Sequence, residues 1–168
     1  MIQTIRAGGI EDLTVILGYE FERIREVIHD KSVRILKNDL WEQGISSSVR
    51  VGLEKIDPKA NDVVMFVVDQ PFLSPELITL FISHYMTHRP DIMATRVGER
   101  LCHPVLFTRR FFTELIDLHG DAGGKQLFQR HAVDYFDWND KRLVLDIDTP
   151  VDYQKYQEFS DDSLSKAA

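Results

Sequence analysis

The chain has 168 residues, 43% of them hydrophobic, which is enough for one domain with a substantial core. A formal net charge of -7 argues against a nucleic-acid-binding surface as the main function. The single cysteine excludes a disulfide framework and a cysteine-based zinc site, and no apolar run approaches the ~20 residues of a membrane span. The first residues lack the apolar centre of a signal peptide, so we expect a cytoplasmic protein without nucleic-acid or membrane partners.

Short apolar runs and segments with helical periodicity alternate along the chain. We expect strands at 13–17, 33–36, 62–69, 92–97, 105–107, 133–138 and 142–147. Between them we expect helices at 20–30, 46–56, 75–88 (capped by Ser74), 108–118 and 125–131. A last helix is opened by the capping box Thr149–Asp152. This order predicts a single α/β domain with a mostly parallel sheet over residues 1–159, followed by a disordered tail over 160–168.

Two adjacent glycines, Gly8 and Gly9, stand near the start of the sequence. Such a pair can cradle a phosphate or end a helix. The strand expected at 13–17 begins four residues after Gly9, which leaves no room for the helix that a phosphate loop opens, and the first lysine is Lys31. The spacing therefore predicts that Gly9 ends a first helix and leads into the first strand.

Carboxylates close two of the expected strands. Asp69 closes the most apolar strand, and Asp146 and Asp148 close the last one. Ligands of open α/β sheets bind at the carboxyl ends of the strands, and Mg²⁺ prefers one or two carboxylates together with substrate phosphates. Asp69 and Asp146 are therefore a candidate magnesium pair. The alternative is that Asp69 caps a turn and Asp148 caps the last helix.

Three other segments carry side chains that suit a ligand. The turn 44–48 enters a helix, where backbone N–H groups and serine hydroxyls suit a phosphate or a ribose but also serve as simple caps. Cys102 and His103 precede an apolar strand, where both residue types also occur as packing residues. The loop 120–125 can hold an anion with Lys125 or merely connect two helices, and it lacks the spacing of a Walker loop.

Five motifs stand in one order along the chain. They are Asn38 with Trp41–Ser48, Asp69–Phe72, His103–Phe107, Gly120–Gly123 and Asp146–Tyr153. Together they resemble the motifs of the MobA-like nucleotidyltransferases, and within that family most closely those of the molybdenum cofactor cytidylyltransferases, over residues 2–156. The resemblance implies a three-layer Rossmann-like fold of the nucleotide-diphospho-sugar transferase type. It also implies transfer of a nucleotide, CMP in the first place, from an NTP (CTP or GTP) to a molybdopterin-type acceptor, with release of pyrophosphate.

The resemblance also implies roles for individual residues. Asp69 and Asp146 would be catalytic and would hold Mg²⁺, which offsets the negative charge that develops during in-line attack on the α-phosphorus. The nucleotide would be bound by Gly44, Ser46, Ser47, Ser48 and Gln70. The acceptor side would be formed by His103, Asp121 and Gly123. Cys102 is a departure, because the family more often has a glycine there.

A larger departure concerns the start of the chain. The family opens with a strand and a Gly-rich loop that cradles the triphosphate, and Gly9 matches instead the glycine before the family's second strand. We therefore expect an N-terminally shortened domain whose sheet has a gap between two unpaired strand edges. A rearranged strand order, an element exchanged within a homodimer, or a partner protein would fill this gap.

Two other functions stay open from the sequence. One is a non-catalytic module that binds the cofactor or a partner during maturation of molybdoenzymes. The other is a transferase that uses a sugar nucleotide, because Asp146 and Asp148 form the Asp-x-Asp pattern with which glycosyltransferases bind metal and diphosphate. The remaining motifs do not support this second alternative.

Overall fold

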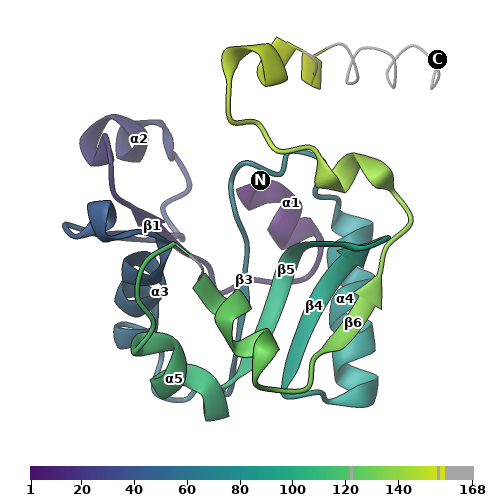
Figure 1. Cartoon of the computed structure of the whole chain (residues 1–168). Coiled ribbons are helices and arrows are strands. Elements are labelled where there is room, and N and C mark those ends of the chain that lie inside the picture. The colour runs from purple at the N-terminus through teal and green to yellow at the C-terminus, as the bar shows by residue number, and fades with distance from the viewer. Residues whose placement is uncertain (122, 155, 158–168) are drawn as a thin grey trace.

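The computed structural model describes residues 1–121, 123–154 and 156–157, and its described strands form two sheets (Figure 1). The smaller sheet pairs β1 (Thr14–Leu17) with β2 (Arg34–Lys37) in parallel. The larger sheet has the order β3 (Asp62–Met65), β5 (Arg100–Thr108), β4 (Ile92–Val97) and β6 (Asp134–Asp137). Strand β5 runs antiparallel to both of its neighbours, whereas β4 and β6 are parallel. The expected α/β class is confirmed, with a mixed sheet rather than a mostly parallel one.

Helices cover both faces of the larger sheet. Helices α3 (Ile45–Glu54) and α5 (Phe112–Ile116) cover one face, and α4 (Pro75–His88) covers the other. Helix α1 (Ile2–Ala7) packs on α4, and α2 (Phe21–Val27) adjoins β1 of the smaller sheet. Short 3-10 helices complete the described elements: η1 (Trp41–Gln43), η2 (Arg109–Phe111), η3 (Gly123–Gln129) and η4 (Lys141–Val144). Alternation along the strands divides the core, because successive side chains point to opposite faces. Ile92 and Ala94 of β4 pack with α3 and α5, while Met93 between them packs against Phe81 of α4.

The glycines near the N-terminus end a helix, as predicted. Helix α1 stops at Ala7, and the N–H of Gly8 donates to the carbonyl of Thr4 at 3.1 Å. Gly9 has φ +95°, in the left-handed region that favours glycine. Gly8 touches α4, since a Cβ atom there would lie 2.5 Å from Cβ of Ile78. The segment is therefore a turn that seats α1 on α4 and leads into β1.

The two sheets are separate, as the predicted gap requires. Within the described residues β1 pairs only with β2, and the other edge of β3 has no strand partner. Helix α3 contacts both sheets: Gly52 admits the side chain of Ile16 from β1, and Leu53 shares a cluster with Met65 of β3. The apolar run of β3 continues beyond its last paired residue, and Val68 is 84% exposed. A rearranged strand order does not fill the gap among these residues.

The strand expected at 142–147 is wrong. Residues 141–144 form η4, because the side chain of Asp140 accepts the N–H of Arg142 and caps a tight turn. The following segment joins neither sheet. The next cap agrees with the prediction, since the N–H of Thr149 donates to Asp152 at 3.1 Å and the N–H of Asp152 to Thr149 at 3.3 Å. The predicted tail 160–168 lies outside the described residues.

Candidate active site

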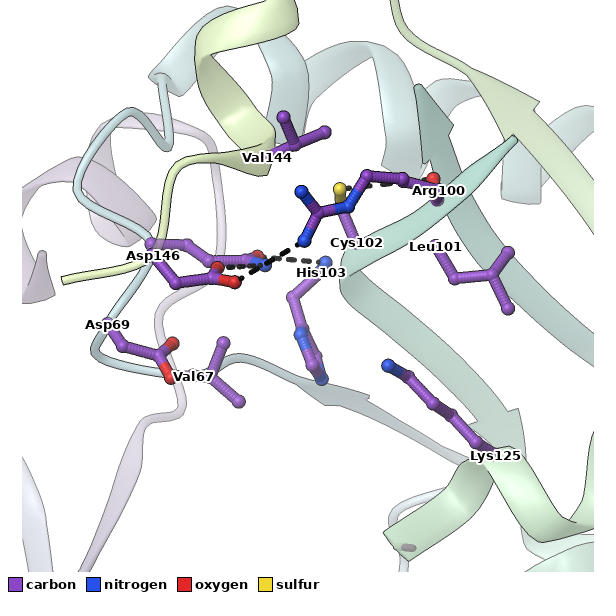
Figure 2. Close-up of a pocket in the computed structure, with 10 residues that line it drawn as sticks. Val67, Asp69, Arg100, Leu101, Cys102, His103, Lys125, Val144 and Asp146 are labelled. Carbon is purple, nitrogen blue, oxygen red and sulfur yellow. Dashed lines mark hydrogen bonds and ion pairs between the residues drawn. The ribbon is translucent and has the colours of Figure 1, made fainter. Parts of the chain in front are cut away.

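A cavity of about 170 Å³ lies just beyond the end of β3 (Figure 2). Its lining comes from four segments of the chain: Val67, Asp69 and Gln70 after β3; Arg100, Leu101, Cys102 and His103 in β5; Lys125 in η3; and Val144 and Asp146 around the end of η4. The antiparallel pairing of β3 with the second half of β5 explains this convergence: Met65, the last residue of β3, lies opposite Val105, so the first half of β5 extends past the end of β3. The sequence positions involved are up to about 80 residues apart.

The cavity brings Asp69 and Asp146 together, although Asp146 follows η4 and not the strand expected at 142–147. The N–H of Ile147 donates to the carbonyl of Asp69 at 2.9 Å, which ties the two segments side by side. Burial, and next to it repulsion by Asp146, raise the pKa of Asp69 above its usual range. Its Oδ1 atom is buried without a hydrogen-bond partner. A buried unsatisfied carboxylate oxygen beside a second carboxylate is the arrangement that a cation relieves.

These two carboxylates fit a divalent metal ion of the magnesium type. No cluster of three or more His, Cys, Asp or Glu side chains in the described part of the chain can enclose a metal. A pair of carboxylates at an open cavity leaves further coordination positions for water and phosphate oxygens, which is how Mg²⁺ is commonly held. Asp69 and Asp146 therefore suit an ion that binds together with a phosphorylated substrate.

Gln70 links the second carboxylate to β5. It is 8% exposed, its Nε2 donates to Oδ1 of Asp146 at 3.2 Å, and its Oε1 accepts the backbone N–H of His103 at 3.0 Å. Both ends of the amide are thus engaged by the protein itself. Gln70 orients Asp146 in this arrangement, and its expected contact with a nucleotide stays a prediction.

His103 presents a neutral imidazole to the cavity. Burial, and then the nearby charge of Lys125, lower its pKa to about 4, so the ring is uncharged at neutral pH. Its Nδ1 atom is buried and has no partner among the described residues. Burial raises the pKa of the adjacent Cys102 thiol, which keeps it protonated and makes it a packing residue rather than a nucleophile.

Two cationic side chains line the same cavity. Arg100 places Nη2 at 3.8 Å from Oδ2 of Asp146, with its side chain 64% exposed. Lys125 extends toward the imidazole of His103 (Figure 2). From the sequence, Lys125 is only part of a loop that can hold an anion, and Arg100 was missed altogether. The one signal for Arg100 is a basic residue beside a turn, and only the pairing of β5 brings it to the cavity.

The serines of the turn 44–48 lie apart from this cavity. Ser46 and Ser47 are each 2% exposed, and Asn38 donates its Nδ2 to the hydroxyls of Ser47 and Ser48 at 2.8 and 2.9 Å. The turn is held instead by the loop before η3, because Oδ1 of Asp121 accepts the N–H of Ile45 at 3.3 Å.

Gly44 and Gly123 belong to this second group. Gly44 has φ +90°, and a Cβ atom there would lie 2.7 Å from the carbonyl carbon of Gly120. A Cβ atom on Gly123 would lie 3.2 Å from Cγ2 of Ile45. The structure therefore forms two groups: Asp69, Gln70, His103 and Asp146 line the cavity, while Gly44, Ser46, Ser47, Ser48, Asp121 and Gly123 surround the contact between the turn 44–48 and the loop before η3.

A family model described as the MobA-like NTP transferase domain matches residues 1–135. The chain belongs to this family. The resemblance to the MobA-like nucleotidyltransferases is thereby confirmed, and the chain is a nucleotidyltransferase-like protein. No helix of the described residues is long and apolar enough to cross a membrane.

Solved structures support the same fold for this MobA-like chain. Rv0371c from Mycobacterium tuberculosis H37Rv is 28% identical with a TM-score of 0.82, covering 94% of this chain and 80% of that one. A second structure of that protein, in complex with manganese, has a TM-score of 0.77 and 28% identity over 92% of this chain and 82% of that one. Molybdopterin-guanine dinucleotide biosynthesis protein A from Archaeoglobus fulgidus has a TM-score of 0.65 and 15% identity, covering 89% and 78%, and shows the fold alone.

A curated relative matches over a shorter stretch. The bifunctional protein GlmU from Symbiobacterium thermophilum is 28% identical over 104 residues, which are 62% of this chain. The chain spans about a fifth of that protein, 21% of its length. The three-layer Rossmann-like fold expected from the motifs is thus confirmed by the solved structures of its neighbours.

Proposed function

We propose that this protein transfers a nucleotidyl group from an NTP to a phosphate-bearing acceptor, with a divalent metal ion held by Asp69 and Asp146. The observation that carries the proposal is the buried, unpartnered Oδ1 of Asp69 next to the carboxylate of Asp146 in the cavity. Membership of the MobA-like NTP transferase family supports it. In this reaction an acceptor phosphate oxygen bonds to the α-phosphorus while the bond to the β-phosphate breaks and pyrophosphate leaves.

The metal ion would supply charge neutralisation of the phosphates. The residues of the chain would supply positioning. Gln70 fixes the carboxylate of Asp146, and the buried environment of Asp69 keeps its oxygen free of competing protein donors. Arg100, at 3.8 Å from Asp146, adds positive charge on the same side of the cavity. Carboxylates that are oriented before the reaction need little rearrangement as charge develops, which favours the transition state.

The finer assignment follows the motif resemblance. It gives CMP as the transferred nucleotide, a molybdopterin-type acceptor and Mg²⁺ as the metal ion. The turn 44–48 with Ser46, Ser47 and Ser48 would then face the nucleotide, and His103, Asp121 and Gly123 the acceptor. A cytoplasmic location and a homodimer that fills the gap between β1 and β3 stay predictions on the same basis. Light scattering of the purified chain tests the dimer.

A titration of the full chain with CTP and GTP, each with and without Mg²⁺ or Mn²⁺, tests the proposal. We expect NTP binding that the metal strengthens, and pyrophosphate release on addition of a molybdopterin-type acceptor. Asp69→Asn should abolish the metal effect, while Asp12→Asn, an exposed acid without a described partner, should preserve it. Absence of NTP binding at millimolar concentration would refute catalysis by this chain and favour the non-catalytic binding module.

A further inference from the structure

The cavity has a second wall that the metal pair does not use. Lys125 extends along this wall toward the ring of His103, on the far side of that ring from Asp69 and Asp146 (Figure 2). In the described part of the chain Lys125 has neither an ion-pair nor a hydrogen-bond partner, although acidic residues outnumber basic ones by 27 to 20. The neighbouring Nδ1 of His103 is buried and unpartnered as well. Two unsatisfied nitrogen groups thus share one wall.

The fold holds Lys125 in this place. Gly124, the residue before it, lies so close to β5 that a Cβ atom would be 2.6 Å from Cζ of Phe107. Leu127, two residues after it, is fully buried in the core cluster with Leu115. The start of η3 is therefore pressed onto the sheet on both sides of Lys125. Its exposed side chain leaves the core along the cavity.

The chemistry of this wall suits an oxyanion. An ammonium group and a neutral imidazole N–H both donate hydrogen bonds, and the imidazole brings no charge that opposes the ammonium. The low pKa of His103, caused by burial and by Lys125, is consistent with a neutral ring beside a charged lysine. The positive charge of Lys125 opposes a metal ion there, and the carboxylates that line the cavity in the described chain, those of Asp69 and Asp146, lie across the imidazole. If Lys125 were only a solvent-exposed surface lysine, the buried and unpartnered Nδ1 of His103 would remain unexplained.

We propose that Lys125 and His103 form a binding site for a phosphate group of a small-molecule ligand. The identity of this phosphate rests on the proposed function, in which two phosphate-containing groups come near the metal pair. One is the phosphate of the acceptor, and the other is the diphosphate that leaves the NTP. Lys125 supplies the charge and His103 supplies one oriented N–H, so the phosphate lies across the imidazole from Asp69 and Asp146.

Isothermal titration of the full chain with inorganic phosphate, at constant ionic strength, tests the site. We expect Lys125→Met to weaken phosphate binding by about tenfold or more, as for the loss of a charge-assisted hydrogen bond. Lys125→Arg should retain most of the affinity. The matched control Lys59→Met removes an exposed lysine before β3, at the opposite end of that strand, and should change the affinity less than about twofold.

Two further probes identify the source of the phosphate. If pyrophosphate and CTP lose affinity in Lys125→Met while glycerol phosphate does not, the site takes the diphosphate of the NTP. The reverse pattern assigns the acceptor phosphate, and either pattern supports the site. Absent phosphate binding in the wild type, unchanged affinity in Lys125→Met, or an equal loss in Lys59→Met overturns it.

The outcome is independent of the metal pair. If Asp69→Asn abolishes metal-dependent CTP binding but Lys125→Met leaves every phosphate probe unchanged, the phosphate site fails and the proposed function stands. If phosphate binding depends on Lys125 while the wild type binds no NTP with metal, the proposed function fails and the phosphate site stands.

Discussion

The side-chain amide of Gln70 donates a hydrogen bond to Oδ1 of Asp146 at 3.2 Å, although the two residues are 76 positions apart. The same amide accepts the N–H of His103 at 3.0 Å. One buried side chain thus orients a carboxylate of the metal pair and fixes it relative to β5. Groups that orient metal ligands affect metal affinity without touching the ion.

Leucine at position 70 removes both hydrogen bonds at similar volume. We expect Gln70→Leu to weaken Mn²⁺ binding by about tenfold or more, because Asp146 loses its orientation. The free energy of unfolding should fall by about 1–3 kcal/mol, because the N–H of His103 is left unpaired. Electron paramagnetic resonance of free Mn²⁺ and urea denaturation measure the two effects. Gln3→Leu on α1, where the side chain is exposed, should change neither, and unchanged Mn²⁺ affinity in Gln70→Leu would contradict the positioning role.

The raised pKa of Asp69 predicts a stability that depends on pH. The folded protein binds this proton more tightly than the unfolded chain, so the stabilisation is present below the ordinary value of 3.8 and is lost as the pH rises through the folded pKa. The neutral amide in Asp69→Asn does not titrate and has no such loss. We therefore expect Asp69→Asn to raise the urea midpoint at pH 7 without metal, with the difference vanishing near about pH 3.5.

The metal provides the control for this prediction. Mg²⁺ or Mn²⁺ stabilises the wild type through the two carboxylates and should narrow or reverse its difference from Asp69→Asn. A variant that is less stable than the wild type at pH 7 in the absence of metal would show that Asp69 has partners in solution that satisfy it.

The lowered pKa of His103 has the opposite effect on the pH dependence of stability from the raised pKa of Asp69. Between the ordinary value of 6.5 and the folded value of about 4, the unfolded chain binds a proton that the folded protein does not. Stability should therefore decrease as the pH falls through this window, by about 3 kcal/mol at most. In His103→Gln this contribution should disappear, which urea denaturation at pH 7 and pH 4.5 can measure. An NMR titration that gives His103 a pKa near 6.5 would contradict the prediction.

Alanine substitutions at two glycines in the left-handed region can distinguish the cost of backbone strain from the cost of steric overlap. Gly9 has φ +95° and open space around a Cβ atom, so Gly9→Ala should cost about 1 kcal/mol. Gly44 has φ +90° and a backbone carbonyl at 2.8 Å from the same position, so Gly44→Ala should cost about 3 kcal/mol or more. Thermal denaturation of both variants checks the order. Equal costs would mean that the loop before η3 yields easily.

The sequence predicts best those elements whose ends carry local signals. The helix expected at 75–88 occurs with these bounds because Ser74 accepts the N–H of Leu77 at 3.1 Å and Pro75 suits the first turn. The strand at 92–97 also keeps its expected bounds. By contrast, β3 ends at Met65 although its apolar run reaches Val68, because pairing and not composition decides where a strand stops.

The candidate site likewise contains features that local sequence signals predict and features that they do not. The rule that ligands bind beyond the ends of strands explains the place of Asp69, after β3. Asp146 reaches the same cavity from the segment after η4, which that rule does not predict. The contribution of Arg100 depends on the register of β5 against β3, which no local pattern encodes. The neutral state of His103 depends on burial by several segments, so it too is a tertiary property.

Because the two sheets are separate, we expect the two parts of the molecule to open locally at different free energies. No backbone ladder joins β1 and β2 to the rest of the described strands, and helix α2 between them contains no buried residue. The central pair β4 and β5, by contrast, is buried over most of β4 and over the second half of β5. Segments with few buried contacts open at low free energy. Amide hydrogens of residues 14–37 should therefore exchange with solvent long before those of residues 92–97 and 104–107.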